Sequence, residues 1–217
     1  MDRALFHLDN IYYIENLRFT GLVCKTNLPS NTAFRGFGGP QGILVVEEAI
    51  NRYAERKGLD PALVRGVNLY REGKDLTPYG QEATKPRIER IYQTLLQHSD
   101  YYQRRLEIDE FNKRSRFVRR GIGFQGVKFG ISFTNSSLNQ GGALVHVYKD
   151  GSVYLNHGGT EMGQGLFMKV AQVVAEEFQV DIDRVKVSAA NTSKVPNTSA
   201  TAASSGTDIN GMAARKA

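Results

Sequence analysis

The hydrophobic pattern of this sequence changes its period near Ser115, and that change limits the fold more than any other feature. Before it, apolar residues recur at helical spacing, as in Ile43, Val46 and Ile50. After it, from Phe117 onward, β-branched and aromatic residues alternate with glycine and polar residues. A chain with both periods predicts a mixed α/β fold in two pieces, with a domain boundary between residues 1–115 and 116–217.

The first piece is expected to be mainly helical. Pro40 suits the first turn of a helix that Gly58 would end, and Asp60 followed by Pro61 predicts the start of a second, short helix. Residues 17–24 have the composition of a strand but no obvious partner nearby.

Two further helices are predicted over residues 87–97 and 101–114. In the first of these, Ile88, Ile91 and Leu95 share one face and are expected to meet the core.

The second piece combines strands and helices. Residues 142–157 predict a β-hairpin, because two alternating runs flank the turn at Asp150-Gly151. A helix over 166–178 and a short strand over 185–188 follow. The last helix is expected to begin at about Ser199.

Composition narrows the class of protein. Of the 217 residues, 41% are hydrophobic and 23% charged, which is ordinary for a globular protein. No apolar run approaches the roughly 20 residues that cross a bilayer, and no secretory signal pattern opens the chain. We therefore expect a cytoplasmic protein without a membrane partner. The single cysteine, Cys24, has no partner in this chain for a disulfide or an iron–sulfur cluster.

The formal net charge of +6 comes partly from a basic cluster in residues 104–120. Such a cluster suggests nucleic-acid binding, but Glu107, Asp109 and Glu110 interrupt it. A solvated helix face or a subunit contact is the commoner explanation of this pattern, and no nucleic-acid partner is expected.

Four segments are richer in glycine, hydroxyl and amide groups than a core requires. They lie at boundaries between predicted elements: residues 31–42, 130–140, 158–165 and 197–207. In the first, glycines would let the backbone approach a ligand just before a helix start, where free N–H groups favour an anion. It is not a dinucleotide fingerprint, because Gln41 stands where the third glycine is required. A simple glycine-rich turn into a helix is the alternative.

The third and fourth segments also precede helices. Gly163, Gln164 and Gly165 fall at one helix start, a position suited to anions. The serine and threonine residues after Asn197 surround another, where ordinary N-capping is the alternative. Glu161 is either an acid or base, or a structural carboxylate that satisfies loop N–H groups; the structural role is favoured.

Other chemistry finds little support. The four histidines show no i,i+4 pair and no carboxylate at ligand spacing, so a protein-ligated metal is not expected and they are interpreted as packing or surface residues. The G-x-S-x-G pattern of serine hydrolases is absent.

The four segments, in this order, resemble the molybdopterin-binding region of the xanthine dehydrogenase and aldehyde oxidase family. The resemblance covers essentially the whole chain. The matching motifs are CKTNLPSNTAFRGFGGPQG (24–42), KFGISFTNSSLNQGGALVHVYKDGSV (128–153), GGTEMGQG (158–165) and VPNTSATAASSGTDINGMA (195–213).

This resemblance implies a molybdenum ion held by the dithiolene of a pterin, with water as the oxygen source for hydroxylating an N-heterocycle or an aldehyde. The backbones of Arg35 and Ala203 would approach the metal from opposite segments. The residues implied to bind the cofactor are Gly163, Gln164, Ser204 and Ser205.

The resemblance also implies a substrate site. Phe37 and Phe133 would clamp a flat heterocycle, one on its face and one at its edge, and Thr134 would hydrogen-bond a purine substituent. Core packing is the alternative for the two phenylalanines.

By the same resemblance, residues 1–115 and 116–217 correspond to the C-terminal part of the first molybdenum-binding domain and the N-terminal part of the second. The chain is expected to be an internal fragment of a xanthine dehydrogenase acting on hypoxanthine or xanthine. The general base would lie beyond Ala217, so no catalytic residue is assigned and the isolated chain is expected to be inactive. Iron–sulfur and FAD regions would be partners in an oligomeric enzyme. An aldehyde oxidase and a truncated module that binds no cofactor are the alternatives.

Overall fold

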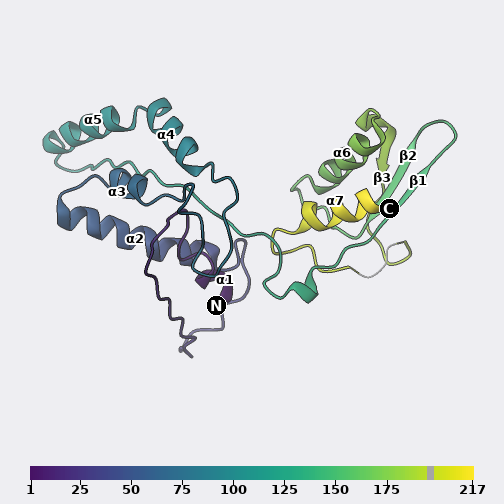
Figure 1. The fold of residues 1–217 in the computed structure, drawn as a ribbon, viewed down its shortest axis with the longest axis horizontal. Helices are drawn as coiled ribbons and strands as arrows, with labels where there is room; N and C mark the ends of the chain where they lie inside the picture. The colour runs from purple at the N-terminus through teal and green to yellow at the C-terminus, as the bar shows by residue number, and fades with distance from the viewer. Residues whose placement is uncertain (195–197) are drawn as a thin grey trace. The chain divides into compact units, whose positions relative to one another are not determined.

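The computed structural model describes residues 1–194 and 198–217, which form two compact units, Met1–Gly130 and Ile131–Ala217. Figure 1 shows helices in both and a small sheet in the second, so the expected mixed α/β class is confirmed. The residues described in the first unit form helices and isolated β-bridges only.

The helices of the first unit agree closely with the sequence pattern. Their bounds are Asp2–Leu5 (α1), Gly39–Lys57 (α2), Pro61–Val67 (α3), Ile88–His98 (α4) and Tyr101–Arg114 (α5). Gly58 ends α2 in the left-handed conformation, with φ of 64°. Asp60 caps α3 by accepting from the Ala62 N–H at 2.7 Å, as its sequence predicted.

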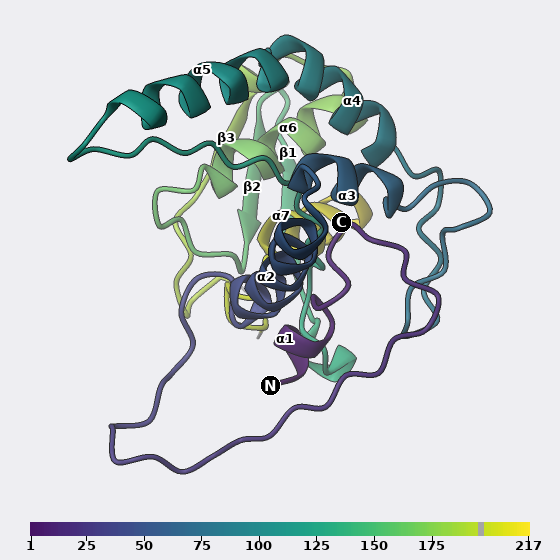
Figure 2. The same cartoon turned by 90° about the vertical axis from the view of Figure 1, so that its left-hand side faces the viewer.

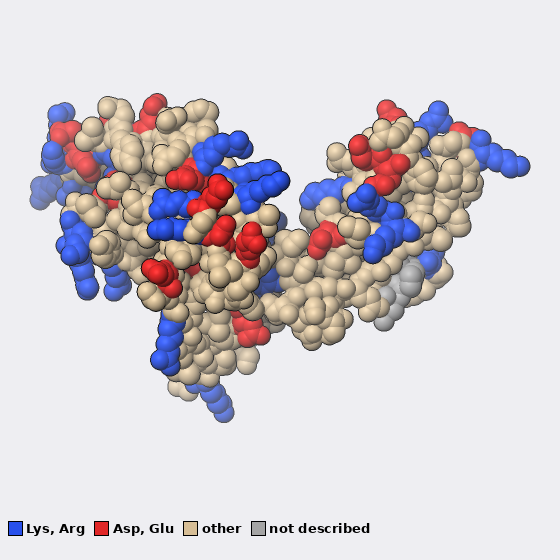
Figure 3. Space-filling model, in the orientation of Figure 1, with Lys and Arg blue, Asp and Glu red and all other residues tan. Residues whose placement is uncertain are grey.

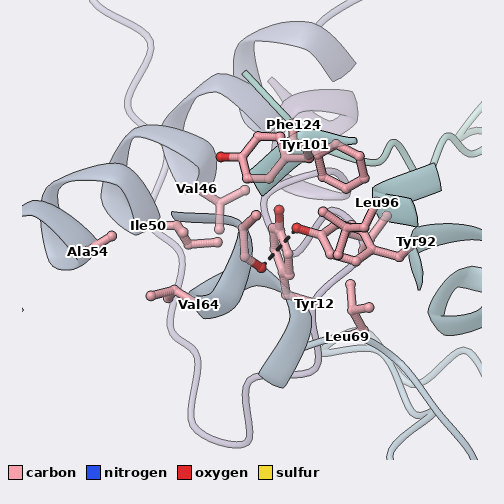
Figure 4. Close-up of a cluster of buried hydrophobic side chains, with 12 residues drawn as sticks. Tyr12, Val46, Ile50, Ala54, Val64, Leu69, Tyr92, Leu96, Tyr101 and Phe124 are labelled. Atoms are coloured by element: carbon pink, nitrogen blue, oxygen red, sulfur yellow. Dashed lines mark hydrogen bonds between the residues drawn. The ribbon is translucent and has the colours of Figure 1, made fainter. Parts of the chain in front are cut away.

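The core of the first unit is rich in aromatic residues (Figure 4). Phe124 meets Tyr92 edge-on, with ring centroids 4.7 Å apart. The predicted inner face of α4 was partly wrong: Tyr92 and Leu96 are buried, whereas Ile91 is 55% exposed. Tyr92 can occupy the buried face because its hydroxyl donates to the Ala62 carbonyl at 3.0 Å. The long side chain is therefore buried with its polar group satisfied.

A buried polar network joins the start of the chain to α2 and α3. Glu47 pairs with Arg65 at 2.8 Å, and it also accepts from the Tyr12 hydroxyl at 2.6 Å and from the Asn10 side-chain amide at 2.8 Å. Burial and the hydrogen bond to Glu47 raise the pKa of Tyr12 far above its ordinary value. Removing any one partner would leave a buried polar group unsatisfied, so the network fixes where residues 1–12 lie.

The strand predicted over residues 17–24 does not form. These residues belong to a long stretch between α1 and α2 that has no helix or paired strand, seen as the extended excursion in Figure 2. Leu22 and Val23 are 78% and 84% exposed. A strand is stabilised by its pairing, and this segment has no neighbouring strand.

The second unit is a three-stranded sheet with two helices on one face (Figure 1). Strands Ala143–Val147 (β1) and Val153–His157 (β2) form the predicted antiparallel hairpin, and Val185–Val187 (β3) pairs parallel to β2. The helices are Leu166–Phe178 (α6) and Gly206–Lys216 (α7). Their inner faces and the sheet bury an apolar cluster centred on Leu155, Val170 and Val174.

The last helix begins later than expected. It was predicted from about Ser199, but α7 starts at Gly206. The residues before it cannot continue a helix, because Ala203 and Ser204 have φ of 54° and 57°.

Residues 116–130, which the sequence assigns to the second domain, pack within the first compact unit. Phe124 enters its core, and Asn10 donates to the Gly126 carbonyl at 3.0 Å. Short 3₁₀ turns at Ser136–Leu138 and Ile182–Arg184 complete the elements of the second unit.

Candidate functional site

The FRGFGG loop, residues 34–39, is a tight turn that leads directly into α2. The Phe37 N–H donates to the Phe34 carbonyl at 2.7 Å, and Phe37 has φ of 51°, in the left-handed region. Its side chain is 52% exposed, and Arg35 is exposed as well. A bulky, exposed side chain on a strained backbone is typical of a binding site, because packing of that side chain does not explain the strain.

The glycines of this loop are used for packing within the first unit. A Cβ on Gly39 would lie 2.5 Å from Cε2 of Phe129, and a Cβ on Gly38 would lie 3.2 Å from the Ala4 nitrogen. Gly42, in the first turn of α2, is tighter still, with only 2.1 Å to the Ala4 oxygen. The close approach expected at Gly38 and Gly39 is therefore made, in this structure, to the protein's own chain.

The sequence did not predict a role for two buried side chains near this loop, Arg3 and His7. Arg3 is 5% exposed and donates to the Gly130 carbonyl, and His7 is 2% exposed and accepts from the Gly130 N–H at 2.9 Å. Both contact the Phe129 ring. The only signal in the sequence is their i,i+4 spacing, which places them on one side of a single helical turn.

His7 is held neutral. Burial lowers its pKa below the ordinary value; its hydrogen bond to the Arg3 backbone opposes this, and the charges of Arg3 and Lys128 reinforce it. Its Nδ1 lies 2.6 Å from the Arg3 carbonyl, which can only accept, so Nδ1 carries the proton and Nε2 is free to accept from Gly130.

In the second unit, Phe133 is held by its backbone. The Asn139 side chain accepts from the Phe133 N–H at 2.8 Å and donates to the Phe133 carbonyl at 3.1 Å. Ser132, just before it, has φ of 73°, and its hydroxyl donates to Asp208 at 3.0 Å. The Phe133 side chain is partly buried, and Thr134 is exposed.

The GGTEMGQG loop, residues 158–165, is held by its own side chains. Glu161 accepts from the N–H groups of Gly163, Gly165 and Phe167 at 2.8, 3.0 and 3.1 Å. These backbone hydrogen bonds, Phe167 first, lower the pKa of Glu161. Glu161 therefore has a structural role: its carboxylate is the anion that binds the free N–H groups at the start of α6.

Gln164 closes the same loop. Its Oε1 accepts from the Met162 N–H at 2.5 Å and its Nε2 donates to the Thr160 carbonyl at 2.8 Å. Gly163, with φ of 96°, is exposed, and a Cβ there would meet nothing within 4 Å, so the outer side of the loop is open.

The segment before α7 carries the other predicted cofactor residues. Ala203 and Ser204 are both left-handed, and Ser204 is exposed. Ser205 is 3% exposed, and its hydroxyl donates to the Ala202 carbonyl at 2.8 Å. Residues 195–197, at the start of this predicted motif, lie outside the described residues.

Hydrogen bonds bring the three motifs of the second unit together. The Thr160 N–H donates to the Thr201 hydroxyl at 2.8 Å, joining the GGTEMGQG loop to the segment before α7. The Ser199 N–H donates to the Gln140 carbonyl at 3.0 Å, joining that segment to the motif that carries Phe133. The FRGFGG loop belongs to the first unit.

Of the remaining histidines, His157 packs in the interior and His98 and His146 are exposed, as expected of packing and surface residues. His157, at the end of β2, is 1% exposed, its Nδ1 accepts from the Gly159 N–H at 3.1 Å, and its ring meets Phe167 edge-on. Burial lowers its pKa.

The basic cluster of residues 104–120 is interspersed with acidic side chains (Figure 3). Arg105 lies 3.4 Å from Asp60, and Lys113 lies 2.6 Å from Glu110. Arg120 covers the Phe111 ring at 3.8 Å. Intramolecular contacts thus account for several of these cations.

Two family models match this chain. Both describe a molybdopterin cofactor-binding domain, one over residues 94–217 and one over residues 1–69. The chain belongs to the family of molybdopterin cofactor-binding domains.

Within this family, several curated relatives of the chain are xanthine dehydrogenases. Xanthine dehydrogenase/oxidase of Felis catus is 52% identical over 217 residues, which cover 100% of this chain and 16% of that protein. Xanthine dehydrogenase of Calliphora vicina is 51% identical over 213 residues, 98% of this chain and 16% of that protein. The chain thus spans about a sixth of the length of these relatives.

Solved structures support the fold. The aldehyde oxidoreductase from Desulfovibrio gigas superposes with a TM-score of 0.69 at 23% identity, over 99% of this chain and 24% of that one. The CO dehydrogenase from Oligotropha carboxidovorans gives 0.65 at 19% identity, over 83% of this chain and 24% of that one.

The donor groups of the structure fit a molybdopterin cofactor. Among residues 1–194 and 198–217, no group of three or more His, Cys, Asp or Glu side chains could hold a metal ion. A cofactor that brings its own metal ligands needs backbone amides and hydroxyl groups, which the open GGTEMGQG loop and the exposed Ser204 offer. None of the described helices is long and apolar enough to span a membrane.

Proposed function

We propose that this chain is the molybdopterin-binding part of a xanthine dehydrogenase that hydroxylates hypoxanthine or xanthine, with water as the oxygen source. One observation carries the proposal. Phe37, Ala203 and Ser204, which the motifs assign to substrate, metal and cofactor, are all non-glycine residues held at positive φ. Left-handed backbone costs energy at such residues and persists at sites where function requires the geometry.

The proposed cofactor residues are expected to act in different ways. Ser204 exposes its hydroxyl and can contact the pterin or its phosphate. The buried Ser205 hydroxyl is bound to Ala202, so Ser205 shapes the segment. The backbones of Arg35 and Ala203 would face the metal, which the pterin dithiolene holds and which supplies the redox chemistry. Gly163 and Gln164 would bind the cofactor on the open side of their loop.

Phe37 and Phe133 are each proposed to contact the flat substrate, with Thr134 as a hydrogen-bonding group. The exposed ring of Phe37 and the exposed Thr134 are available for this. A purine suits two aromatic contacts and one hydroxyl.

The whole protein would supply what this chain does not carry. A general base elsewhere would complete the catalyst, and electrons would pass to iron–sulfur and FAD regions of a cytoplasmic, oligomeric enzyme. The chain alone would lack the contribution of that base, on the order of 100- to 10,000-fold in rate, and we propose that it is inactive by itself.

The first test measures molybdenum and pterin in the purified chain, and in Ala203→Leu with Ala200→Leu as the matched control. We expect cofactor in the wild type and the control and its loss in Ala203→Leu, since leucine at a left-handed position near the metal is both strained and bulky.

The second test places this segment in the corresponding region of a curated relative and compares turnover of xanthine with that of an aldehyde. Xanthine turnover is the expected result. A chimera that keeps the cofactor but turns over only the aldehyde would establish the aldehyde oxidase alternative. Absence of cofactor from both preparations would establish a non-catalytic module.

A further inference from the structure

The ring of Phe129 occupies the space above Gly39, at the end of the FRGFGG loop. Besides Cε2 at 2.5 Å, its Cδ2 lies 3.2 Å from where a Cβ on Gly39 would be. Phe129 is 90 positions away in the sequence, so this contact ties the loop to a distant segment of the same unit.

The segment that carries Phe129 is anchored by the start of the chain at the residues on either side of it, Lys128 and Gly130. The Lys128 N–H donates to Oδ1 of Asn10 at 3.0 Å, and the Lys128 ammonium pairs with Asp9. His7 accepts from the Gly130 N–H at 2.9 Å. The backbone on either side of Phe129 is therefore fixed by side chains that are themselves buried.

The Phe129 ring is also contacted by two buried side chains, His7 and Arg3. The His7 ring lies 4.7 Å from the Phe129 ring, tilted by 40°, and the Arg3 guanidinium lies 5.6 Å from it. With its backbone anchored on both sides and its ring in contact with His7 and Arg3, Phe129 has little freedom to move away from Gly39.

The FRGFGG loop requires such a support. Phe37 is strained at φ of 51°, and a strained turn keeps its shape only where its surroundings over-determine it. Within the loop the backbone hydrogen bonds are Phe37 to Phe34 at 2.7 Å and Gly39 to Gly36 at 2.9 Å.

We propose that Phe129 is a positioning residue for the FRGFGG loop, and that neutral His7 holds Phe129 in place. The contact with Gly39 maintains the backbone that presents Arg35 and Phe37. Its relevance to catalysis rests on the proposed function, whereas the support of the loop does not.

The first experiment measures hydrogen exchange of the Gly39 and Gly42 amides in the full chain and in Phe129→Leu. We expect exchange to accelerate by about two- to tenfold at these amides, the equivalent of one aromatic contact, with the amide of Ala54 in the core of α2 unchanged. Phe124→Leu is the matched control, since it removes a buried ring from the same unit without touching the loop. Equal acceleration in both variants would overturn the proposal.

A double-mutant cycle tests the contact directly. Gly39→Ala places a Cβ against Cε2 of Phe129, and Phe129→Leu removes that atom. The double variant should exchange at least threefold more slowly at Gly42 than the product of the single effects predicts. Effects that simply multiply would show that the ring does not hold the loop.

Rescue tests the part played by His7. Glutamine retains an acceptor for the Gly130 N–H and leucine does not, so His7→Gln should keep the protection of Gly39 and Gly42 that His7→Leu loses. If His7→Leu fails to fold, loss of protection in His7→Gln would by itself contradict the assignment.

Molybdenum content of the same variants separates the two proposals. If neither the wild-type chain nor the chimera holds molybdenum but the exchange pattern is as expected, the proposed function is refuted and the support of the loop is established. Molybdenum retained in the wild type, with no change of exchange in the variants, would refute the support of the loop and leave the proposed function standing.

Discussion

Two glycine-rich loops lead into helices in this protein, and they are held by different means. The FRGFGG loop and the first turn of α2 are packed from outside, with Gly38 and Gly42 against Ala4 and Gly39 against Phe129. The GGTEMGQG loop is held from within by the side chains of Glu161 and Gln164. Similar composition therefore yields one loop that depends on the tertiary fold and one that depends on its own sequence.

The difference predicts how each loop fails. A loop packed from outside should loosen when a distant residue changes, and should be sensitive to added volume. A loop held by its own carboxylate should depend on that one charge and tolerate distant changes.

The largest effect is expected from Gly42→Ala. The new Cβ would lie 2.1 Å from a backbone oxygen, which cannot rotate away as a flexible side chain can. The free energy of unfolding should fall by about 2 kcal/mol despite the better helix propensity of alanine, as measured by urea denaturation. Gly123→Ala, where a Cβ meets nothing within 4 Å, is the control. Equal stability of the two variants would mean that α1 does not dock on α2 as described.

The second effect is expected from Glu161→Gln. Glutamine offers one acceptor oxygen in place of a charged pair, so the amides of Gly163, Gly165 and Phe167 should lose protection from exchange, with a smaller loss of stability than in Gly42→Ala. The FRGFGG loop should stay protected. Glu176→Gln, on α6, is the control; if it exposed these three amides to exchange as much as Glu161→Gln does, the assignment would be refuted.

Acidification should loosen the two loops in sequence. The pKa of His7 is lowered in the folded chain. Its contribution to the free energy of unfolding is therefore complete above 6.5, the ordinary pKa of histidine. That contribution falls as the pH drops below 6.5, because the unfolded chain then binds the proton more readily. The pKa of Glu161 is lowered too. Its contribution to the free energy of unfolding is therefore present above 4.5, the ordinary pKa of glutamate, and is lost as the pH falls through the lower pKa of the folded state.

Exchange corrected for intrinsic rates should therefore rise first at Gly39 and Gly42, and at Gly163 and Gly165 only in more acid solution. In His7→Gln the first step should be absent. Simultaneous loosening of both loops in the wild type would show global unfolding.

The smallest effect is expected from Phe37→Asn. Asparagine tolerates the left-handed region better, and the ring it replaces is 52% exposed, so stability should rise by up to about 1 kcal/mol. Chemical denaturation measures this, with Phe34→Asn as the control on the same loop. A loss of stability would show that the Phe37 ring contributes to packing, contrary to the proposed substrate contact.

Much of the secondary structure was predictable because its signals are local. Gly58, the Asp60-Pro61 pair and the Asp150-Gly151 turn each determine a boundary through backbone conformation or capping. The late start of α7 was not predictable in this way, since the left-handed conformation of Ala203 and Ser204 is unusual for these residue types.

The candidate site divides in the same manner. Its motifs were recognisable as ordered strings of residues, and the structural role of Glu161 followed from its place in a glycine-rich loop before a helix.

The buried face of α4, in the core of the first unit, was predicted wrongly in part. The hydrogen bond from the Tyr92 hydroxyl to the Ala62 carbonyl decides which face is buried, and helical spacing alone cannot show that contact. The roles proposed for the site residues remain predictions.

The sequence by itself determined the helices, the hairpin, the family and the self-contained GGTEMGQG loop, because each depends on residues close together in the chain. Only the tertiary structure decided that the glycines of the FRGFGG loop pack on Ala4 and Phe129, and that Arg3 and His7 hold the Gly130 peptide. Those contacts join residues about 30 to 130 positions apart, and no local pattern encodes which distant side chain fills the space that a glycine leaves.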